Sequence, residues 1–436
     1  MDLQSFRKAL RRDTTMPPFS PVYHPRDPSE STLWQLMSRR YEGFKGAYSS
    51  AFEKRYDFFR PIVDEVVEAY LKCGDLREGF ARVRCTNPDC CHEYLLAFSC
   101  KGRWFCPSCH SKKVVKFGDD ISHNILYPVP HRQYVFSIPI RLRVYFKYDR
   151  ELLTEFCHCA KESLEVFFRN VLGLENGVTG LVMVIHTFGD YARFHPHAHA
   201  IVADGLFRAN GTFYVLPTGD HQPLEEIFRA KILAMLKREG KIDDVLIRKL
   251  MGWRHSGFSV YRGNRIARDD QEGQEALAQY IIRNAFSEDK ITFIDDTGKV
   301  LYRSGMTHGK NKKNFELFTA EEFIAAITQH IPEKSFQMVR YFGWYSNRSR
   351  GTRKKAGLLK PGDEPLKEAL IGEGLIVLDV SDYDPPPVPS KTWRELIKKV
   401  WEVDPLVCPR CGHALKIISL IQYPDVIRQI LEHLGL

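Results

Sequence analysis

Three histidines at alternating positions limit what the middle of this chain can form. They lie in the segment FHPHAHAIV at residues 194–202. Residues two apart share one face of a β-strand, so a strand here would bring His195, His197 and His199 together. A divalent cation is the natural partner of such neighbouring imidazoles, and ordinary surface histidines are the alternative. Proline fits poorly inside a strand, so Pro196 favours a strand that starts after His195 and makes His197 and His199 the preferred pair. Two histidines leave coordination positions open, which suits a catalytic metal.

The cysteines are concentrated in two places. Six of the eleven lie between residues 85 and 109, and a separate Cys-x-x-Cys pair is formed by Cys408 and Cys411. In a chain without a secretion signal, such clusters indicate metal ligands before disulfides. The spacing favours one structural zinc site with four cysteine ligands. Its expected ligands are Cys85, Cys90, Cys106 and Cys109.

Several alternatives to this site stay open. Cys91 could replace Cys90, and Cys100, His92 and His110 are further candidate ligands. The cluster could instead hold buried free thiols or carry redox chemistry. The Cys408 and Cys411 pair looks like half of a second metal site, which would need remote ligands such as His433.

Length and composition indicate a globular chain of several domains. The 436 residues are enough for roughly three domains. With 44% hydrophobic and 27% charged residues, the chain is not disordered, collagenous or a coiled coil. Its net charge of +9 permits a polyanionic partner. We find neither an apolar run of about 18 residues nor a secretory signal, which predicts a protein of the reducing cytoplasm.

Helical and strand-like patterns are mixed without regular alternation, which favours an α+β fold. Helices are expected at 33–72, 149–171, 224–239, 244–253 and 271–286, with another beginning at Thr319. Strands are expected at 131–138, 181–187 and 197–203, with a hairpin over 291–302. We expect an irregular N-terminal arm (1–30), a helical and zinc-binding domain (31–120), a central domain (125–356), a linker (357–391) and a C-terminal tail (392–436) with short helices.

Tyr280 lies inside the helix expected over residues 271–286. Ala276 stands one turn before it and Asn284 one turn after it. A tyrosine on a helix usually serves packing. Next to a divalent metal that polarises a phosphodiester, however, a phenol becomes an adequate nucleophile.

Six stretches of the chain, taken in order, resemble HUH-type rolling-circle transposases of the insertion-sequence ninety-one family. Two of them are HPHAHAIVADG at 195–205 and AQYIIRNAFS at 278–287. The others are AFSCKGRWFCPSCHSKK at 97–113, HRQYVFSIPIRLR at 131–143, FTAEEFIAAITQHIPEKSFQMVRYFGWYSNRSRG at 318–351 and CPRCGHALKII at 408–418. Together they span nearly the whole chain.

The resemblance implies a fold and a chemistry. The fold is a central antiparallel, ferredoxin-like HUH nuclease sheet flanked by helices, with the histidines on a middle strand, behind an N-terminal transposase zinc-binding domain. His197 and His199 would bind Mg²⁺ or Mn²⁺. Tyr280 would attack a single-stranded DNA phosphate, leaving a 5′-phosphotyrosine and a free 3′-hydroxyl.

Two positions depart from the family pattern or leave it open. Some members carry two tyrosines four residues apart, whereas this chain has Ala276 before Tyr280, which implies a single-tyrosine enzyme. The third metal ligand would be His195, from the strand geometry, or Asn284, by analogy with related HUH enzymes.

Basic side chains beside aromatic rings predict contacts with DNA. The run RYFGWYSNRSRGTRKK at 340–355 combines stacking groups with charge, as single-strand binding sites do. Two further lysines follow the cysteine cluster. The candidate DNA-binding residues are Arg340, Arg348, Arg350, Arg353, Lys354, Lys355, Lys112 and Lys113. The expected partners are single-stranded DNA and the DNA of the element ends.

Three other functions stay open. A plasmid-type replication initiator would use the same chemistry on another target. A non-catalytic zinc protein would bind DNA while Tyr280 only packs. A metal phosphodiesterase would use water as the nucleophile and form no covalent adduct.

Overall fold

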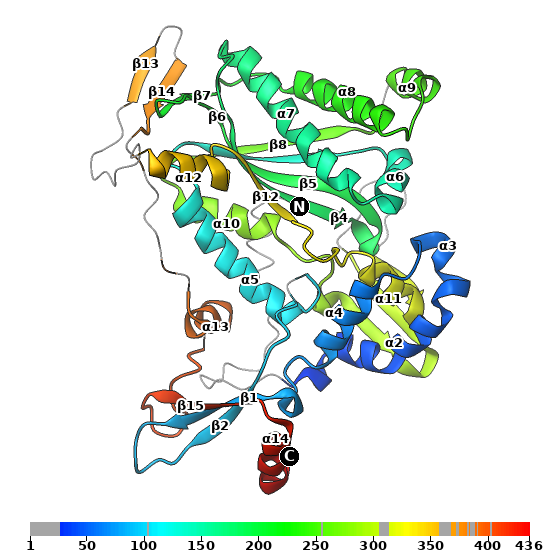
Figure 1. Cartoon of the computed structure of the whole chain (residues 1–436), viewed down its shortest axis with the longest axis vertical. Coiled ribbons are helices and arrows are strands. Elements are labelled where there is room, and N and C mark those ends of the chain that lie inside the picture. Colours follow the sequence, from blue (N-terminus) through cyan, green and yellow to red (C-terminus); the bar gives the residue numbers. More distant parts are fainter. Residues whose placement is uncertain are drawn as a thin grey trace.

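A five-stranded antiparallel sheet forms the centre of the computed structural model (Figure 1). Its spatial order is β12 (Val339–Gly343), β4 (Gly180–Phe188), β5 (Phe194–Ala203), β3 (His131–Ser137) and β8 (Ser259–Ile266). The structure describes residues 27–102, 104–253, 256–304, 314–356, 368–371, 375–381, 383, 389, 391–401 and 403–436. The expected α+β fold is confirmed, and the histidine strand β5 is the middle strand of the sheet.

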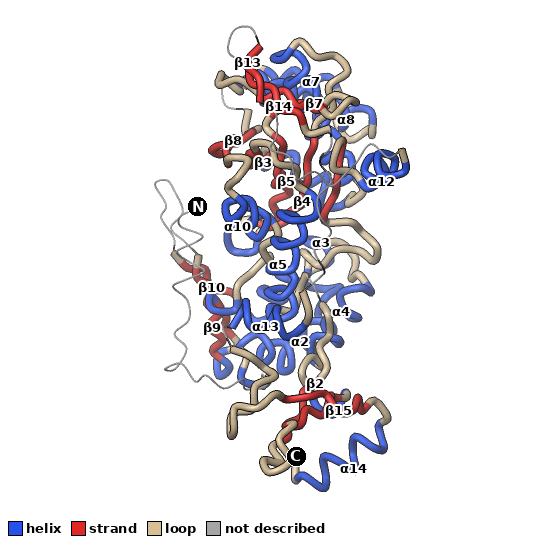
Figure 2. The backbone as a smooth tube through the Cα atoms, turned by 90° about the vertical axis from the view of Figure 1, so that its left-hand side faces the viewer, coloured by secondary structure: helices blue, strands red, loops and turns tan. Residues whose placement is uncertain are grey.

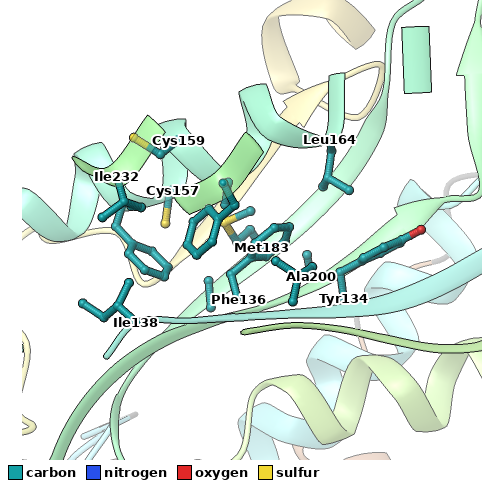
Figure 3. Close-up of a cluster of buried hydrophobic side chains, with 14 of the residues drawn as sticks. Tyr134, Phe136, Ile138, Cys157, Cys159, Leu164, Met183, Ala200 and Ile232 are labelled. Carbon is teal, nitrogen blue, oxygen red and sulfur yellow. The ribbon is translucent and has the colours of Figure 1, made fainter. Parts of the chain in front are cut away.

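Two helical layers cover the two faces of this sheet. On one face, α7 (Leu152–Leu172) and α8 (Gln222–Arg238) bury a cluster of apolar side chains (Figure 3). It includes Tyr134, Phe136, Leu164, Met183, Ala200 and Ile232. On the other face lie α5 (Pro107–Asp120) and α10 (Gln271–Ile281), where Val184 and Ile201 pack with Leu277. Because side chains alternate along β5, His197 and His199 belong to this second face.

The helices α5 and α10 approach each other closely. A Cβ atom at Gly118 of α5 would lie 2.5 Å from Cγ of Gln279, so the absence of a side chain permits this contact. The sequence predicted that this helix would continue to residue 286, but α10 ends earlier, at Ile281.

The N-terminal helices form a second body together with a later segment of the chain. The helices are α2 (Thr32–Ala51), α3 (Glu53–Tyr56) and α4 (Pro61–Leu71). They share a core with β9 (Ile291–Ile294), β10 (Lys299–Arg303), β11 (Phe315–Thr319) and α11 (Ala320–Thr328). The predicted hairpin is present, and Thr319 opens α11 with a reciprocal capping box to Glu322. The helical module expected at the N-terminus is therefore completed by residues from the central region.

The C-terminal tail returns to the N-terminal region. β15 (Leu415–Ile421) pairs antiparallel with β1 (Phe80–Cys85), which also pairs with β2 (Glu93–Ala97). This small sheet and α14 (Pro424–Leu434) lie at the lower end of the molecule in Figures 1 and 2. The tail was expected to consist of short helices, but it also supplies a strand. Its first helix, α13 (Trp393–Trp401), packs against α5.

The segment expected as a linker is partly folded. β13 (Glu368–Ile371) and β14 (Leu375–Asp379) extend a sheet that also contains β7 (Thr212–Val215) and β6 (Gly205–Phe207). Residues 1–26 of the expected arm, and 357–367 and 384–388 of the expected linker, lie outside the described residues. Three further helices are α6 (Arg143–Tyr148), α9 (Asp244–Met251) and α12 (Asn347–Lys355). None of the described helices combines the length and apolar character that a membrane span requires.

Candidate metal and nucleophile centre

Three histidines from two neighbouring strands converge beneath α10. His197 and His199 come from β5, and His186 of β4 stands directly opposite His197 in the ladder. One ring nitrogen from each of the three can be chosen so that all lie within 4.8 Å of one another. The ring centroid of His186 is 5.1 Å from that of His197 and 4.5 Å from that of His199. All three residues are buried.

The hydrogen bonds of these rings leave nitrogen atoms free for a metal. Nε2 of His186 donates to the carbonyl of Ile281 at 2.8 Å, so its Nδ1 keeps a lone pair. Nδ1 of His197 donates to the carbonyl of His195 at 2.8 Å, which leaves Nε2 as the lone-pair atom. Nδ1 of His199 lies 3.0 Å from the amide of Gln133. Among the described residues, Nδ1 of His186 and Nε2 of His199 are buried without a hydrogen-bond partner, as metal-ligating atoms would be before a metal binds.

Burial keeps these imidazoles neutral. Desolvation lowers the pKa of His186 and His199 well below the usual value, with a further contribution from the neighbouring histidines. The same desolvation lowers the pKa of His197 to about 3. Neutral imidazole is the form that ligates metal, so the three rings fit a divalent cation.

His195 does not belong to this group. Its Nε2 atom lies 2.9 Å from Oγ of Ser137, and the third histidine of the group is His186 instead. The strand does not begin after His195, as the sequence predicted, but at Phe194. It includes Pro196 because the ladder with β4 shifts its register there and the ladder with β3 ends at the pair of Ser137 and His197. The sequence signal for His186 was a histidine that directly follows the apolar run 181–185 within the predicted strand 181–187.

Tyr280 lies against the histidine group. It is the last residue but one of α10, and its ring centroid lies 5.6 Å from that of His199 in an edge-on arrangement. The residue is 7% exposed. The guanidinium of Arg283 lies 5.4 Å from the Tyr280 ring centroid and 5.7 Å from the Phe188 ring centroid. A tyrosine, a cationic side chain and three neutral histidines thus meet at one place.

Asn284 lies beyond the end of α10, the helix that carries Tyr280. The helix was expected to carry it one turn after Tyr280, but α10 ends three residues earlier. Its Oδ1 atom, which would be the metal ligand, accepts a hydrogen bond from its neighbour's amide, Ala285 N–H, at 2.9 Å. The geometry therefore favours His186 over Asn284 as the third ligand.

Two buried histidines hold the C-terminal end of α10. His186 donates to the carbonyl of Ile281, and Nε2 of His110 donates to the carbonyl of Ile282 at 2.7 Å. The last carbonyls of a helix have no partner within the helix, so these bonds satisfy them and fix the segment that carries Tyr280.

The cysteines form two groups instead of the predicted one. The first consists of Cys73, Cys100, Cys106 and Cys109, and the second of Cys85, Cys90, Cys408 and Cys411. The expected grouping of Cys85 and Cys90 with Cys106 and Cys109 is therefore corrected. β1 leads Cys85 toward the C-terminal strand β15, whereas Cys106 and Cys109 begin α5 beside the end of α4. His433 belongs to neither group.

The first group has the dimensions of a zinc site. Sγ of Cys73 lies 3.7 Å from that of Cys106 and 3.9 Å from that of Cys109, and Cys100 lies 3.7 Å from Cys109. Four thiolates at the corners of a tetrahedron, each about 2.3 Å from zinc, lie about 3.8 Å apart. Backbone N–H groups of Cys100 and Gly102 donate to Sγ of Cys73 and Cys100, which favours thiolates.

Comparison with known proteins places this arrangement in a family. Residues 180–353, which include the three histidines and Tyr280, match the family model described as "Putative transposase". Residues 44–138, which include the whole first cysteine group, match the model described as "Transposase zinc-binding domain". The chain belongs to the insertion-sequence ninety-one family of transposases.

Two relatives agree with this assignment. The transposase for insertion sequence element IS801 of Pseudomonas savastanoi pv. phaseolicola is 26% identical over 369 residues, 81% of this chain and 82% of the relative. The protein described as "Putative transposase y4qJ" of Sinorhizobium fredii is 26% identical over 325 residues, 70% of this chain and 79% of the relative. No solved structure matches the chain. The transposase is thus an enzyme that acts on DNA, with a zinc-binding domain.

The predicted DNA-binding residues of the transposase fall into two classes. Arg348, Lys354 and Lys355 are exposed on α12. Arg353 is 7% exposed, because its guanidinium stacks 3.8 Å from the Trp344 ring centroid and donates to the Trp344 carbonyl. Its place is structural, which corrects the prediction for this residue.

The remaining predicted DNA contacts are partly engaged within the transposase. Arg340 donates to Oγ1 of Thr154 at 2.8 Å, and Arg350 donates to the Asn124 carbonyl at 3.2 Å. Nζ of Lys113 lies 3.9 Å from the Trp104 ring centroid. Lys112 is half-buried on α5. Among the predicted DNA-binding residues, the exposed ones without such contacts are therefore Arg348, Lys354 and Lys355 on α12.

Proposed function

We propose that this transposase cleaves and joins single-stranded DNA through a 5′-phosphotyrosine and so drives rolling-circle-type transposition in the cytoplasm. The observation that carries the proposal is the position of Tyr280 beside three buried, neutral histidines, two of which have a ring nitrogen without a hydrogen-bond partner among the described residues. Family membership favours transposition over replication initiation.

His186, His197 and His199 would hold Mg²⁺ or Mn²⁺. When bound, the cation polarises the scissile phosphate and stabilises the charge that develops on it. Three ligands leave coordination positions for phosphate oxygens. The hydrogen bonds of His186 and His197 to backbone carbonyls fix their tautomers, so the ring nitrogens point as the ligation requires.

Tyr280 performs the covalent step. Its Oη forms a bond to phosphorus while the bond from phosphorus to the 3′-oxygen breaks. The phenolic proton passes to water, and the departing oxygen takes up a proton to become a 3′-hydroxyl. The phosphotyrosine bond conserves the energy of the phosphodiester, so the same centre can rejoin the strand by the reverse reaction.

The first cysteine group is proposed to bind a structural zinc ion. It lies where α5 begins, and α5 reaches the tyrosine helix through Gly118 and through the bond from His110 to the Ile282 carbonyl. Zinc binding would therefore hold the scaffold on which Tyr280 is placed.

The test of the proposed function is detection of a covalent adduct. Purified protein is incubated with Mn²⁺ or Mg²⁺ and labelled single-stranded oligonucleotides from the DNA that flanks its gene, then separated on a denaturing gel. We expect a labelled band at the mass of protein plus DNA. Cleavage without that band would establish a hydrolase, and tight binding without cleavage across all flanking sequences would establish a DNA-binding protein.

Arg283 is expected to bind the phosphate that Tyr280 attacks. Its guanidinium lies beside the Tyr280 ring, and its buried Nε atom has no hydrogen-bond partner among the described residues. Arg283→Ala should slow adduct formation roughly 100-fold in single-turnover assays, because a cation at the developing charge is lost. Arg193→Ala, at an exposed arginine, is the control. An unchanged rate for Arg283→Ala would contradict this role.

The exposed cations of α12 are expected to bind the DNA backbone. Replacement of Arg348, Lys354 and Lys355 by Glu should weaken binding of single-stranded DNA and flatten its dependence on salt. Each lost phosphate contact lowers the logarithmic slope by about 0.7, so three should lower it by roughly 2. Reversal of the exposed Arg248 and Lys249 on α9 is the matched control, measured by fluorescence anisotropy. Equal slopes for both variants would place the DNA elsewhere.

A further inference from the structure

The second cysteine group brings together residues from β1 and the connection that follows it with residues from the C-terminal tail. Cys85 ends β1 and Cys90 follows in the connection to β2, whereas Cys408 and Cys411 precede β15. The Sγ atoms of Cys85 and Cys411 are 3.5 Å apart, and those of Cys90 and Cys408 are 3.6 Å apart. We infer that these four cysteines bind a second structural zinc ion, which fastens the C-terminal tail to the N-terminal zinc-binding region. Two of the ligands lie far outside residues 44–138, which match the zinc-binding domain.

Backbone hydrogen bonds and a left-handed glycine fix the loops that carry the four thiols. Cys408 N–H donates to the His413 carbonyl at 2.8 Å, and Gly412 N–H donates to the Cys408 carbonyl at 2.9 Å. Gly412 has a φ of 74°, which lets the chain reverse after Cys411. On the other side, Asn87 N–H donates to Sγ of Cys85 at 3.4 Å. A hydrogen bond to sulfur favours the thiolate, the form that binds zinc.

The small sheet that carries these cysteines has little other support. Beside the cysteines, few apolar residues of this unit are buried. On β15, apolar side chains such as Ile417 (50% exposed) and Leu420 (62% exposed) face outward instead. Units with such small cores usually depend on a metal or on disulfides. The structure has no disulfide in this sheet, and the four Sγ atoms of the second cysteine group lie within 4.8 Å of one another, as the ligands of one metal ion would. The Sγ distances agree with the value of about 3.8 Å for tetrahedral zinc.

The C-terminal tail also contacts α5 and α10, the two helices next to the candidate active site. Lys391, just before α13, pairs with Asp119 of α5, and Lys399 of α13 pairs with Glu275 of α10. The zinc ion would fix the far end of this segment. It would therefore hold α13 against both α5 and α10, the helix that carries Tyr280.

Metal content of the reduced, full-length protein tests the inference. We expect two zinc ions per chain by mass spectrometry, and one in the double variant Cys408→Ser with Cys411→Ser. Cys91→Ser is the matched control and should keep two, because the exposed Cys91 belongs to neither group. Titration of the metal-free wild type with Co²⁺ gives a second reading that needs no variant. Thiolate-to-cobalt absorption should keep rising until two equivalents are bound.

One zinc or cobalt ion in the wild type would overturn the inference, as would two zinc ions in the double variant. Fewer than eleven reactive thiols in unfolded protein that was never reduced would show disulfides instead. A protease site inserted between Pro386 and Pro387 tests the fastening. After cleavage the tail should stay bound and should separate when zinc is chelated, and a tail that survives chelation would refute the fastening. None of these readings depends on the proposed DNA chemistry.

Discussion

Tyr280→Phe is expected to abolish the protein–DNA adduct. The substitution removes one oxygen atom and keeps the ring that packs against His199 and Arg283. Without the hydroxyl no phosphotyrosine bond can form, and loss of a nucleophile lowers the rate by more than roughly a thousandfold. The measurement is the yield of labelled adduct on a denaturing gel after incubation with single-stranded oligonucleotide and Mn²⁺.

The fold should survive this change. Loss of a single hydrogen-bonding group costs about 1 kcal/mol of unfolding free energy, so the melting temperature and DNA affinity should stay near those of the wild type. Tyr261→Phe is the matched control, because Tyr261 lies on the edge strand β8 and is 55% exposed. Adduct formation by Tyr280→Phe at the rate of the wild type would move the nucleophile to another residue.

Local patterns in the sequence predicted the elements around this site well. Alternation over 197–203 indicated the histidine strand, and the strand is at the centre of the sheet. The acidic first turn after Thr319 indicated the start of α11, and the capping box is present. These features depend on residues a few positions apart, which a single sequence displays directly.

Features that depend on long-range pairing could not be read in the same way. His186 joins the histidine group only because β4 pairs with β5 in the register that sets it opposite His197. Spacing suggested a single group for Cys85 and Cys106, but β1 pairs with β15 and carries Cys85 to Cys411 instead. Arg353 lies in a basic run, yet it stacks on Trp344 and is buried. In each case the deciding partner lies on another element.

His186→Ala is expected to weaken binding of the divalent metal by removing a ligand, and to lower cleavage with it. Its Nδ1 atom is buried without a hydrogen-bond partner among the described residues, and a ring nitrogen from each of His186, His197 and His199 can be chosen so that all three lie within 4.8 Å of one another. We expect Mn²⁺ affinity, measured by electron paramagnetic resonance of the free ion, to fall at least roughly 100-fold, and adduct yield to fall with it. Saturation at much higher Mn²⁺ should restore part of the yield.

Two control variants separate ligation from the other contacts of this region. His195→Ala should retain Mn²⁺ affinity, because its ring is hydrogen-bonded to Ser137 and lies outside the group. His186→Ala also removes the bond to the Ile281 carbonyl, and His110→Ala removes the equivalent bond to Ile282 while leaving the three histidines in place. If the helix end alone mattered, His110→Ala and His186→Ala would lower adduct yield alike and leave Mn²⁺ affinity unchanged. If Mn²⁺ affinity fell in His195→Ala and not in His186→Ala, the third ligand would instead be His195, as the sequence first indicated.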